Sequence, residues 1–147
     1  MTENRLSSVV LDSPMPMGDP QGANFVYTDE GKPTGLVMAT VRVSSLDMAV
    51  EFYRDLLKMT PLQETDTEVI MSCGEQMIML KKSPAEWVGG DTGLVLSTDS
   101  IYDLHRRLID EAVVFAQPPE RRELGLTAVL SDDDGNLLTF IELPSVP

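Results

Sequence analysis

The sequence predicts an α+β fold built from one structural unit that occurs twice. A stretch with strand-like composition changes into one with helical periodicity over residues 36–57, and the same change returns at residues 93–111. Three further strand-like segments follow each predicted helix. A strand–helix–three-strand unit that recurs after about sixty residues is the signature of an internal repeat.

The first unit begins with a strand at residues 36–43, where β-branched and aliphatic residues are frequent. Ser44, Ser45 and Asp47 then offer side-chain oxygens to the free amides of a first helical turn. Apolar residues recur at helical spacing over residues 46–58, and Pro61 ends this helix. Strands are expected next at residues 61–63, 68–72 and 76–81.

The second unit repeats this order with a strand at residues 93–98, caps at Asp99 and Ser100, and a helix at residues 100–111. Its spacing directs Leu104, Leu108 and Ile109 towards the sheet. Gln117, Pro118, Pro119 and Glu120 predict a loop, and the Asp-rich run that ends in Gly135-Asn136 predicts a hairpin turn rather than a calcium site. The three strands of this unit are expected at residues 113–116, 126–131 and 136–143.

Residues 1–35 do not fit the repeat and are predicted to form an irregular N-terminal arm. Prolines and glycines interrupt residues 12–24, although residues 6–11 suit a short strand. The expected organisation is therefore an arm (1–35) and one domain (36–143) with modules at 36–82 and 92–143. The linker between the modules contains the only tryptophan, Trp87.

The length and composition of the chain limit the classes of protein to which it can belong. A chain of 147 residues with 42% hydrophobic content supports one domain with an ordinary core. No run of eighteen apolar residues suggests a membrane span, and the acidic, weakly apolar N-terminus does not resemble a secretory signal. The single cysteine, Cys73, excludes a disulfide framework, so a cytoplasmic location is expected.

The net charge of -13 argues against a nucleic-acid partner, because phosphate neutralisation needs clustered Lys and Arg. It is compatible with simple solubility or with a cationic ligand.

Two motifs carry a family resemblance. The pattern V-R-V-x-S-L-x-x-A-x-x-F-Y-x-x-L-L at residues 41–57, together with D-D-D-G-N-L-L at residues 132–138, resembles the vicinal-oxygen-chelate superfamily of glyoxalase, bleomycin-resistance and extradiol dioxygenase proteins. The resemblance covers roughly residues 36–143. It implies two tandem βαβββ modules that form a curled mixed sheet around a cleft, usually in a homodimer.

The resemblance also identifies the positions of metal ligands. Metal-dependent members hold one divalent ion with His and Glu side chains from the central strands, and these positions correspond here to Met38, Met79, Gly93 and Thr139. Such a donor set cannot supply the charge or coordination that a divalent ion needs. The only histidine, His105, lies on the second predicted helix, where a surface position is expected. No metal and no cofactor are therefore expected.

The same positions suggest an adaptable apolar pocket, because methionine is flexible and polarizable. Arg42 is expected either to bind a carboxylate or phosphate at the edge of this pocket or to pair with a surface acid, and Trp87 is expected to cap the pocket. The alternative is that the methionines fill gaps in the core and that Trp87 is buried at an interface. The candidate ligand-binding residues are Met38, Thr40, Arg42, Met77, Met79, Trp87, Gly93, Val95, Leu137 and Thr139.

Three functions remain open from the sequence. The first is a metal-free small-molecule binding protein, similar to the bleomycin-resistance branch, with an apolar or cationic ligand. The second is a metal-dependent lyase, isomerase or ring-cleaving dioxygenase, against which the missing ligands argue. The third is a structural or regulatory partner whose cleft is filled by its own side chains. No nucleophile motif or phosphate-binding loop supports a further enzyme class.

Overall fold

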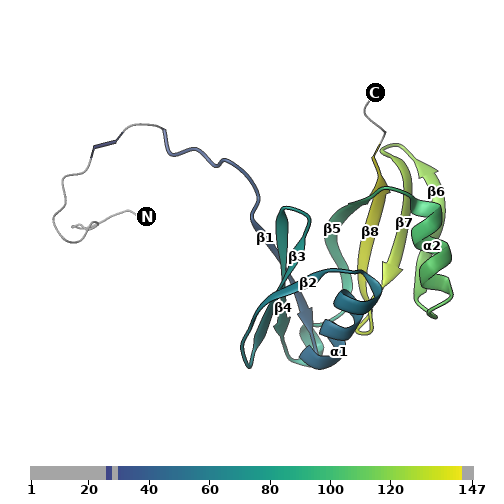
Figure 1. The fold of residues 1–147 in the computed structure, drawn as a ribbon, viewed down its shortest axis with the longest axis horizontal. Helices are drawn as coiled ribbons and strands as arrows, with labels where there is room; N and C mark the ends of the chain where they lie inside the picture. The colour runs from purple at the N-terminus through teal and green to yellow at the C-terminus, as the bar shows by residue number, and fades with distance from the viewer. Residues whose placement is uncertain (1–25, 28–29, 144–147) are drawn as a thin grey trace. The chain divides into compact units, whose positions relative to one another are not determined.

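Strand-forming segments pair into two four-stranded sheets in the computed structural model, which describes residues 26–27 and 30–143 (Figure 1). The order is β1-β4-β3-β2 in the first sheet and β5-β8-β7-β6 in the second. In each sheet the first and last strands of the module pair in parallel, and the other pairs are antiparallel. The strands are β1 (Met38–Val43), β2 (Thr60–Glu64), β3 (Glu68–Cys73), β4 (Gln76–Lys82), β5 (Gly90–Thr98), β6 (Val114–Arg122), β7 (Gly125–Ser131) and β8 (Asn136–Glu142).

This topology confirms the predicted α+β fold of two βαβββ modules. Backbone hydrogen bonds divide the strands into two sheets instead of joining them into one. Within the described part of the chain, none of the helices has the length and hydrophobicity that a membrane span requires.

The first helix begins as predicted but changes its winding. The Ser45 side chain accepts a hydrogen bond from the Met48 amide at the start of α1 (Leu46–Val50), which continues as the π-helical η1 (Glu51–Leu56). A single regular helix was the expectation here. The wider turn places the Leu57 amide on the Phe52 carbonyl at 3.2 Å, five residues back.

The second helix, α2 (Ile101–Ile109), is capped in the same way, because the Ser100 side chain accepts from the Asp103 amide. Leu104 and Leu108 are buried against the sheet as predicted. Ile109 is not, since 49% of its surface is exposed at the last residue of the helix.

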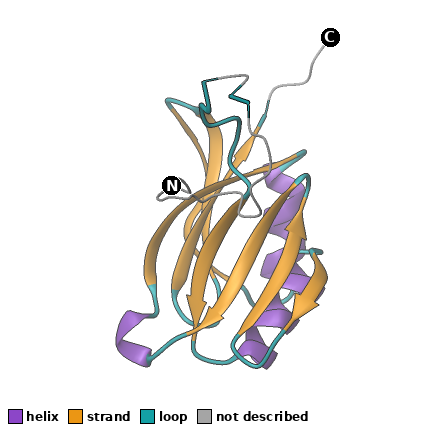
Figure 2. Cartoon of the chain, turned by 90° about the vertical axis from the view of Figure 1, so that its left-hand side faces the viewer, coloured by secondary structure: helices purple, strands orange, loops and turns teal. Residues whose placement is uncertain are grey.

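Within residues 30–143, each sheet has one face that packs against a helix and one that does not. In the first module α1 contacts β3 and β4, and in the second α2 contacts β6, β7 and β8. Alternate residues of the strands, such as Val41 and Val43 in β1 or Ile78 and Leu80 in β4, are buried on the helix side. The buried residues of both modules form one hydrophobic cluster. In Figure 2 the strands pass in front of the longer helical segments, which shows this sidedness.

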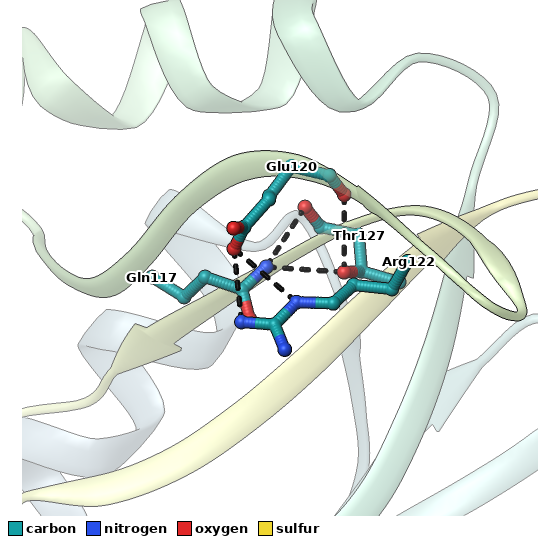
Figure 3. A network of polar contacts seen from close by, with 4 residues as sticks. All are labelled: Gln117, Glu120, Arg122 and Thr127. Carbon is teal, nitrogen blue, oxygen red and sulfur yellow. Dashed lines mark hydrogen bonds and ion pairs between the residues drawn. The ribbon is translucent and has the colours of Figure 1, made fainter.

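The loop expected at residues 117–120 is instead part of β6, which continues through Pro118 and Pro119. Its register with β7 shifts twice, and side chains stabilise the irregular stretch (Figure 3). Gln117 Nε2 donates to Thr127 Oγ1 at 3.1 Å, and Arg122 Nη2 lies 2.9 Å from Glu120 Oε1. β6 tolerates two prolines because it is the edge strand of its sheet, where one side needs no ladder partner.

The chain divides into two units, residues 1–35 and residues 36–147. Of the first unit the structure describes residues 26–27 and 30–35, which adopt no helix or strand. The possible strand at residues 6–11 lies outside the described residues. The linker between the modules contains a short 3-10 helix, η2 (Ala85–Trp87), and β5 begins earlier than the sequence predicts.

The predicted hairpin turn between β7 and β8 is confirmed, and it contains a buried carboxylate. Asp132 Oδ1 accepts from the amides of Asp134 and Asn136 at 2.9 Å. Asp132 Oδ2 accepts from Asn136 Nδ2 at 2.9 Å and from the Tyr53 hydroxyl at 2.8 Å. Burial of the tyrosine and the charge of Asp132 both raise the pKa of Tyr53, so its hydroxyl stays protonated and donates.

The same turn also holds the strand and linker beside it. Asn136 Nδ2 donates to the Arg42 carbonyl, and Asn136 Oδ1 accepts from the Gly89 amide, both at 2.9 Å. Asp134 accepts from the Ser44 hydroxyl at 2.6 Å. The turn therefore connects β1, η1 and the linker.

We expect Asp132→Ala to lower the free energy of unfolding by about 3 kcal/mol, because it leaves buried donors without acceptors. Urea denaturation measures this change. The matched control is Asp133→Asn in the same turn. Partial burial and the charges of Asp132 and Asp134 raise the pKa of Asp133, so its charged form opposes folding at neutral pH.

Asp133→Asn should consequently stabilise the protein slightly at neutral pH. The gain should vanish at acidic pH, where Asp133 is protonated in the wild type as well. Equal destabilisation by the two substitutions would show that the turn, and not the buried carboxylate, determines stability.

Candidate functional site

Strand alternation gathers five of the candidate residues on the face of the first sheet that lies opposite its helix. Met38 pairs with Met77 and Thr40 pairs with Met79 across the parallel β1–β4 ladder. Arg42 lies next on the same face, opposite Lys81. The three methionines are half-buried, while Thr40 and Arg42 are exposed. We call this surface, made by Met38, Thr40, Arg42, Met77 and Met79, the methionine face.

A second group forms on the corresponding face of the other sheet. Val95 pairs with Thr139 across the β5–β8 ladder, and Leu137 lies two residues before Thr139 on β8. Val95 is 57% exposed, and Leu137 and Thr139 are half-buried. We call these three residues the second face.

Gly93 belongs to neither regular ladder. The register of β5 with β8 shifts between Asp91 and Val95, and Gly93 lies inside this irregularity. Its φ is 77°, in the left-handed region, and its amide donates to Asp91 Oδ1 at 2.9 Å. A glycine is needed here for its backbone conformation, whatever the use of the open space beside it.

Arg42 and Trp87, both candidate ligand residues, contact each other. The guanidinium carbon of Arg42 lies 5.3 Å from the centre of the Trp87 ring, within the range of a cation–π interaction. Arg42 Nη1 also donates to Ser83 Oγ at 3.3 Å. Trp87 remains 61% exposed, so it is not buried at an interface within this chain. The contact positions an exposed aromatic ring beside the polar end of the methionine face.

The donor set at the four positions that the family resemblance assigns to metal ligands does not fit a divalent ion. Met38 and Met79 offer thioethers, Gly93 offers no side chain, and Thr139 offers one hydroxyl. Over residues 26–27 and 30–143, no group of three or more His, Cys, Asp or Glu side chains is arranged to hold a metal.

Two other residues have side chains of the type that binds metals, His105 and Glu142, and both make structural contacts. His105 is half-buried, and its ring lies edge-on to Phe115 with centres 4.7 Å apart, so it is not a solvated surface histidine. Glu142 Oε1 accepts from the Ile101 amide at 2.8 Å, at the start of α2. Their side chains therefore support the second module.

Sequence reasoning missed a cavity of about 270 Å³ on the helix side of the sheets. Residues 57–59 and 72–74 of the first module line it together with residues of β5, α2 and β8. No local pattern indicates this cavity, because segments far apart in the chain form its walls.

Comparison with known proteins identifies the family. A family model described as the Glyoxalase/Bleomycin resistance protein/Dioxygenase superfamily matches residues 35–140. The chain belongs to this superfamily. No curated protein matches it.

Solved structures share the fold of this superfamily member. A superfamily protein from Sphaerobacter thermophilus DSM 20745 is 24% identical, with a TM-score of 0.65, and the match covers 76% of this chain and 98% of that one. A lactoylglutathione lyase from Agrobacterium tumefaciens is 19% identical, with a TM-score of 0.64 over 75% and 94% of the two chains. TnmS3, an antibiotic binding protein from Streptomyces sp. CB03234, is 22% identical, with a TM-score of 0.67 over 77% and 98%.

We expect Gly93→Ala to destabilise the protein by about 1 kcal/mol, because a Cβ is unfavourable at this φ even without a clash. Gly35→Ala is the matched control, since the φ of Gly35 lies outside the left-handed region. Thermal unfolding of both variants measures the difference. An equal, small effect of both substitutions would contradict the argument from backbone conformation.

Proposed function

We propose that this superfamily member is a metal-free small-molecule binding protein, which holds an apolar or cationic ligand against the methionine face. One observation carries the proposal. Three methionines on adjacent strands, Met38, Met77 and Met79, are only half-buried on the face opposite the helix. Core-filling methionines would be buried, as Met71 is on the other face of β3.

The chemistry of this surface suits a flat or irregular apolar ligand. Thioethers are polarizable and flexible, so neighbouring methionines adapt to different shapes. Trp87 adds an exposed ring whose face already contacts the cationic Arg42. A cationic aromatic ligand would make a similar contact with this ring, and the net charge of -13 would attract it.

The residues at the expected ligand positions support binding without a metal. A fold that occurs both in a lactoylglutathione lyase and in an antibiotic binding protein does not determine the function by itself. The side chains support binding without a metal, because two thioethers, a glycine and a hydroxyl stand at the positions that the family resemblance assigns to metal ligands. We therefore propose binding rather than metal-dependent catalysis.

We further propose that two copies of the chain form a homodimer and that the ligand lies where the copies meet. Both sheets present apolar side chains that a single chain leaves partly exposed, such as Met79 and Val95. If the second face of one copy covers the methionine face of the other, a ligand between them is shielded from water.

Light scattering after size-exclusion chromatography tests the assembly. A mass of twice the 16.2 kDa of one chain is the expected result, because the uncovered apolar faces then become buried. Val95→Lys should shift the protein towards the monomer. A monomeric wild type at every concentration would contradict the dimer and leave the methionine face as a single-chain site.

The binding test uses Met79→Gln, which keeps the length of the side chain but removes an apolar contact. We expect this variant to bind the aromatic probes 2-naphthol and proflavine about tenfold more weakly. Isothermal titration calorimetry measures the affinity, and the fluorescence of Trp87, the only tryptophan, reports binding beside it. Met48→Gln, at a 55% exposed position on α1, is the matched control.

Two results would contradict the proposal. One is equal affinity of both variants and the wild type for the probes that bind. The other is a near-stoichiometric divalent ion, found by elemental analysis of protein purified without chelator and lost in Thr139→Ala, which would establish the metal-dependent class.

A further inference from the structure

The cavity on the helix side differs in chemistry from the two faces described above. Part of its wall belongs to the hydrophobic core, since Met59, Leu104 and Phe140 are at most 9% exposed. Another part is polar, because Ser72, Ser97 and Thr98 are also among the lining residues. The cavity therefore combines an apolar floor with hydrogen-bonding groups, as small-molecule sites do.

The charges at the cavity have the opposite sign to those of the whole chain. The protein has 24 acidic and 11 basic residues, yet among the described residues that line the cavity the only charged ones are Lys58 and Arg107. These two residues give the lining itself a positive charge, although Asp55, outside the lining, interacts electrostatically with the exposed Lys58. A ligand with a negative group is the one that this arrangement favours.

Arg107 is held in place by the other module. Its Nη1 donates to the Leu56 carbonyl at 2.7 Å, at the end of η1. A guanidinium has five N–H donors in a planar fork, so this bond fixes the group and leaves donors for a further acceptor. The residue is thus prepositioned at the junction of the modules and not extended into solvent.

Lys58 occupies a backbone conformation that glycine normally takes. Its φ is 65°, in the left-handed region, directly after the end of the first helix. Glycine or asparagine is usual at such a position, because a Cβ there costs energy. Ala112 has the same conformation after the second helix, with a φ of 64°, so both modules end their helix in this way, and in the first module the turn places a lysine beside the cavity.

We propose that this cavity binds a small organic carboxylate, with its charged group on Arg107 and Lys58 and its apolar part against Met59, Leu104 and Phe140. The volume of about 270 Å³ is below that of ordinary drug-sized sites, which limits the ligand to a single ring or a short branched chain. This site is separate from the methionine face, and the inference does not depend on the proposed function.

Cys73 provides a built-in reporter, because it lines the cavity and is the only cysteine of the chain. Burial raises the pKa of its thiol, so its alkylation is slow and easily followed by mass spectrometry. The probes are benzoate and its neutral analogue benzamide, and the reagent is the uncharged iodoacetamide. We expect saturating benzoate to slow the labelling of Cys73 about tenfold and benzamide to leave it unchanged.

Three variants separate binding from structural effects. Arg107→Gln should remove most of the protection by benzoate, whereas Arg106→Gln, an exposed neighbour on the same helix, should keep it. Lys58→Gly should weaken benzoate binding while raising the melting temperature, because glycine relieves the backbone strain. A lysine that only ends the helix would give the rise in melting temperature with no loss of protection.

The outcomes are decisive for this cavity. Protection by benzoate that depends on Arg107 and Lys58, with no change in Trp87 fluorescence, supports the proposal and separates it from the methionine face. Equal protection by benzamide or by inorganic phosphate overturns the assignment of an organic carboxylate. No protection by benzoate in the wild type overturns the site itself.

Discussion

The hydrogen bond between Tyr53 and Asp132 is the constraint on which the arrangement of the two modules depends. Both side chains are buried, and they come from a helix of the first module and a turn of the second. A buried carboxylate is unfavourable unless donors surround it, and the turn supplies three more of them. A shift of one module relative to the other would leave these buried groups without hydrogen-bond partners. The hydrogen bond therefore fixes the first module against the second.

That constraint explains why the molecule has two kinds of surface. With the modules joined through η1 and the β7–β8 turn, the helix-covered sides contribute to one core. The other faces of both sheets then remain outside it and keep partly exposed apolar residues. The candidate ligand surface is therefore a consequence of how the modules are joined, and the cavity beside Arg107 marks where their helix sides do not fill the space completely.

The sequence predicted what depends on local patterns. Ser45 and Ser100 mark helix starts because capping needs only neighbouring residues, and the Gly135-Asn136 turn follows from backbone preferences. Alternation also placed Met38 and Met79 on one face, since the pleat fixes the direction of every second side chain.

The features that the sequence could not predict depend on residues that are distant along the chain. β6 keeps its strand pairing through Pro118 and Pro119 because it lies at a sheet edge, which only the strand order reveals. The π-helical turn of η1 and the two-residue irregularity at Gly93 change the register without any break in the hydrophobic pattern. Ile109 has the right spacing for burial but lies at the end of its helix, beyond the reach of the sheet.

The two candidate sites illustrate how one acidic protein can favour ligands of opposite charge. Attraction of a cation to the methionine face draws on the field of the whole chain, which salt screens over about 10 Å. Attraction of an anion to the cavity relies on Lys58 and Arg107, which would contact the anion directly. The Arg107 side chain is fixed by its hydrogen bond to the Leu56 carbonyl. Short contacts in a partly desolvated cavity are screened much less than exposed charges. Salt should therefore weaken the first kind of binding more than the second, and the overall charge does not determine the chemistry of every site.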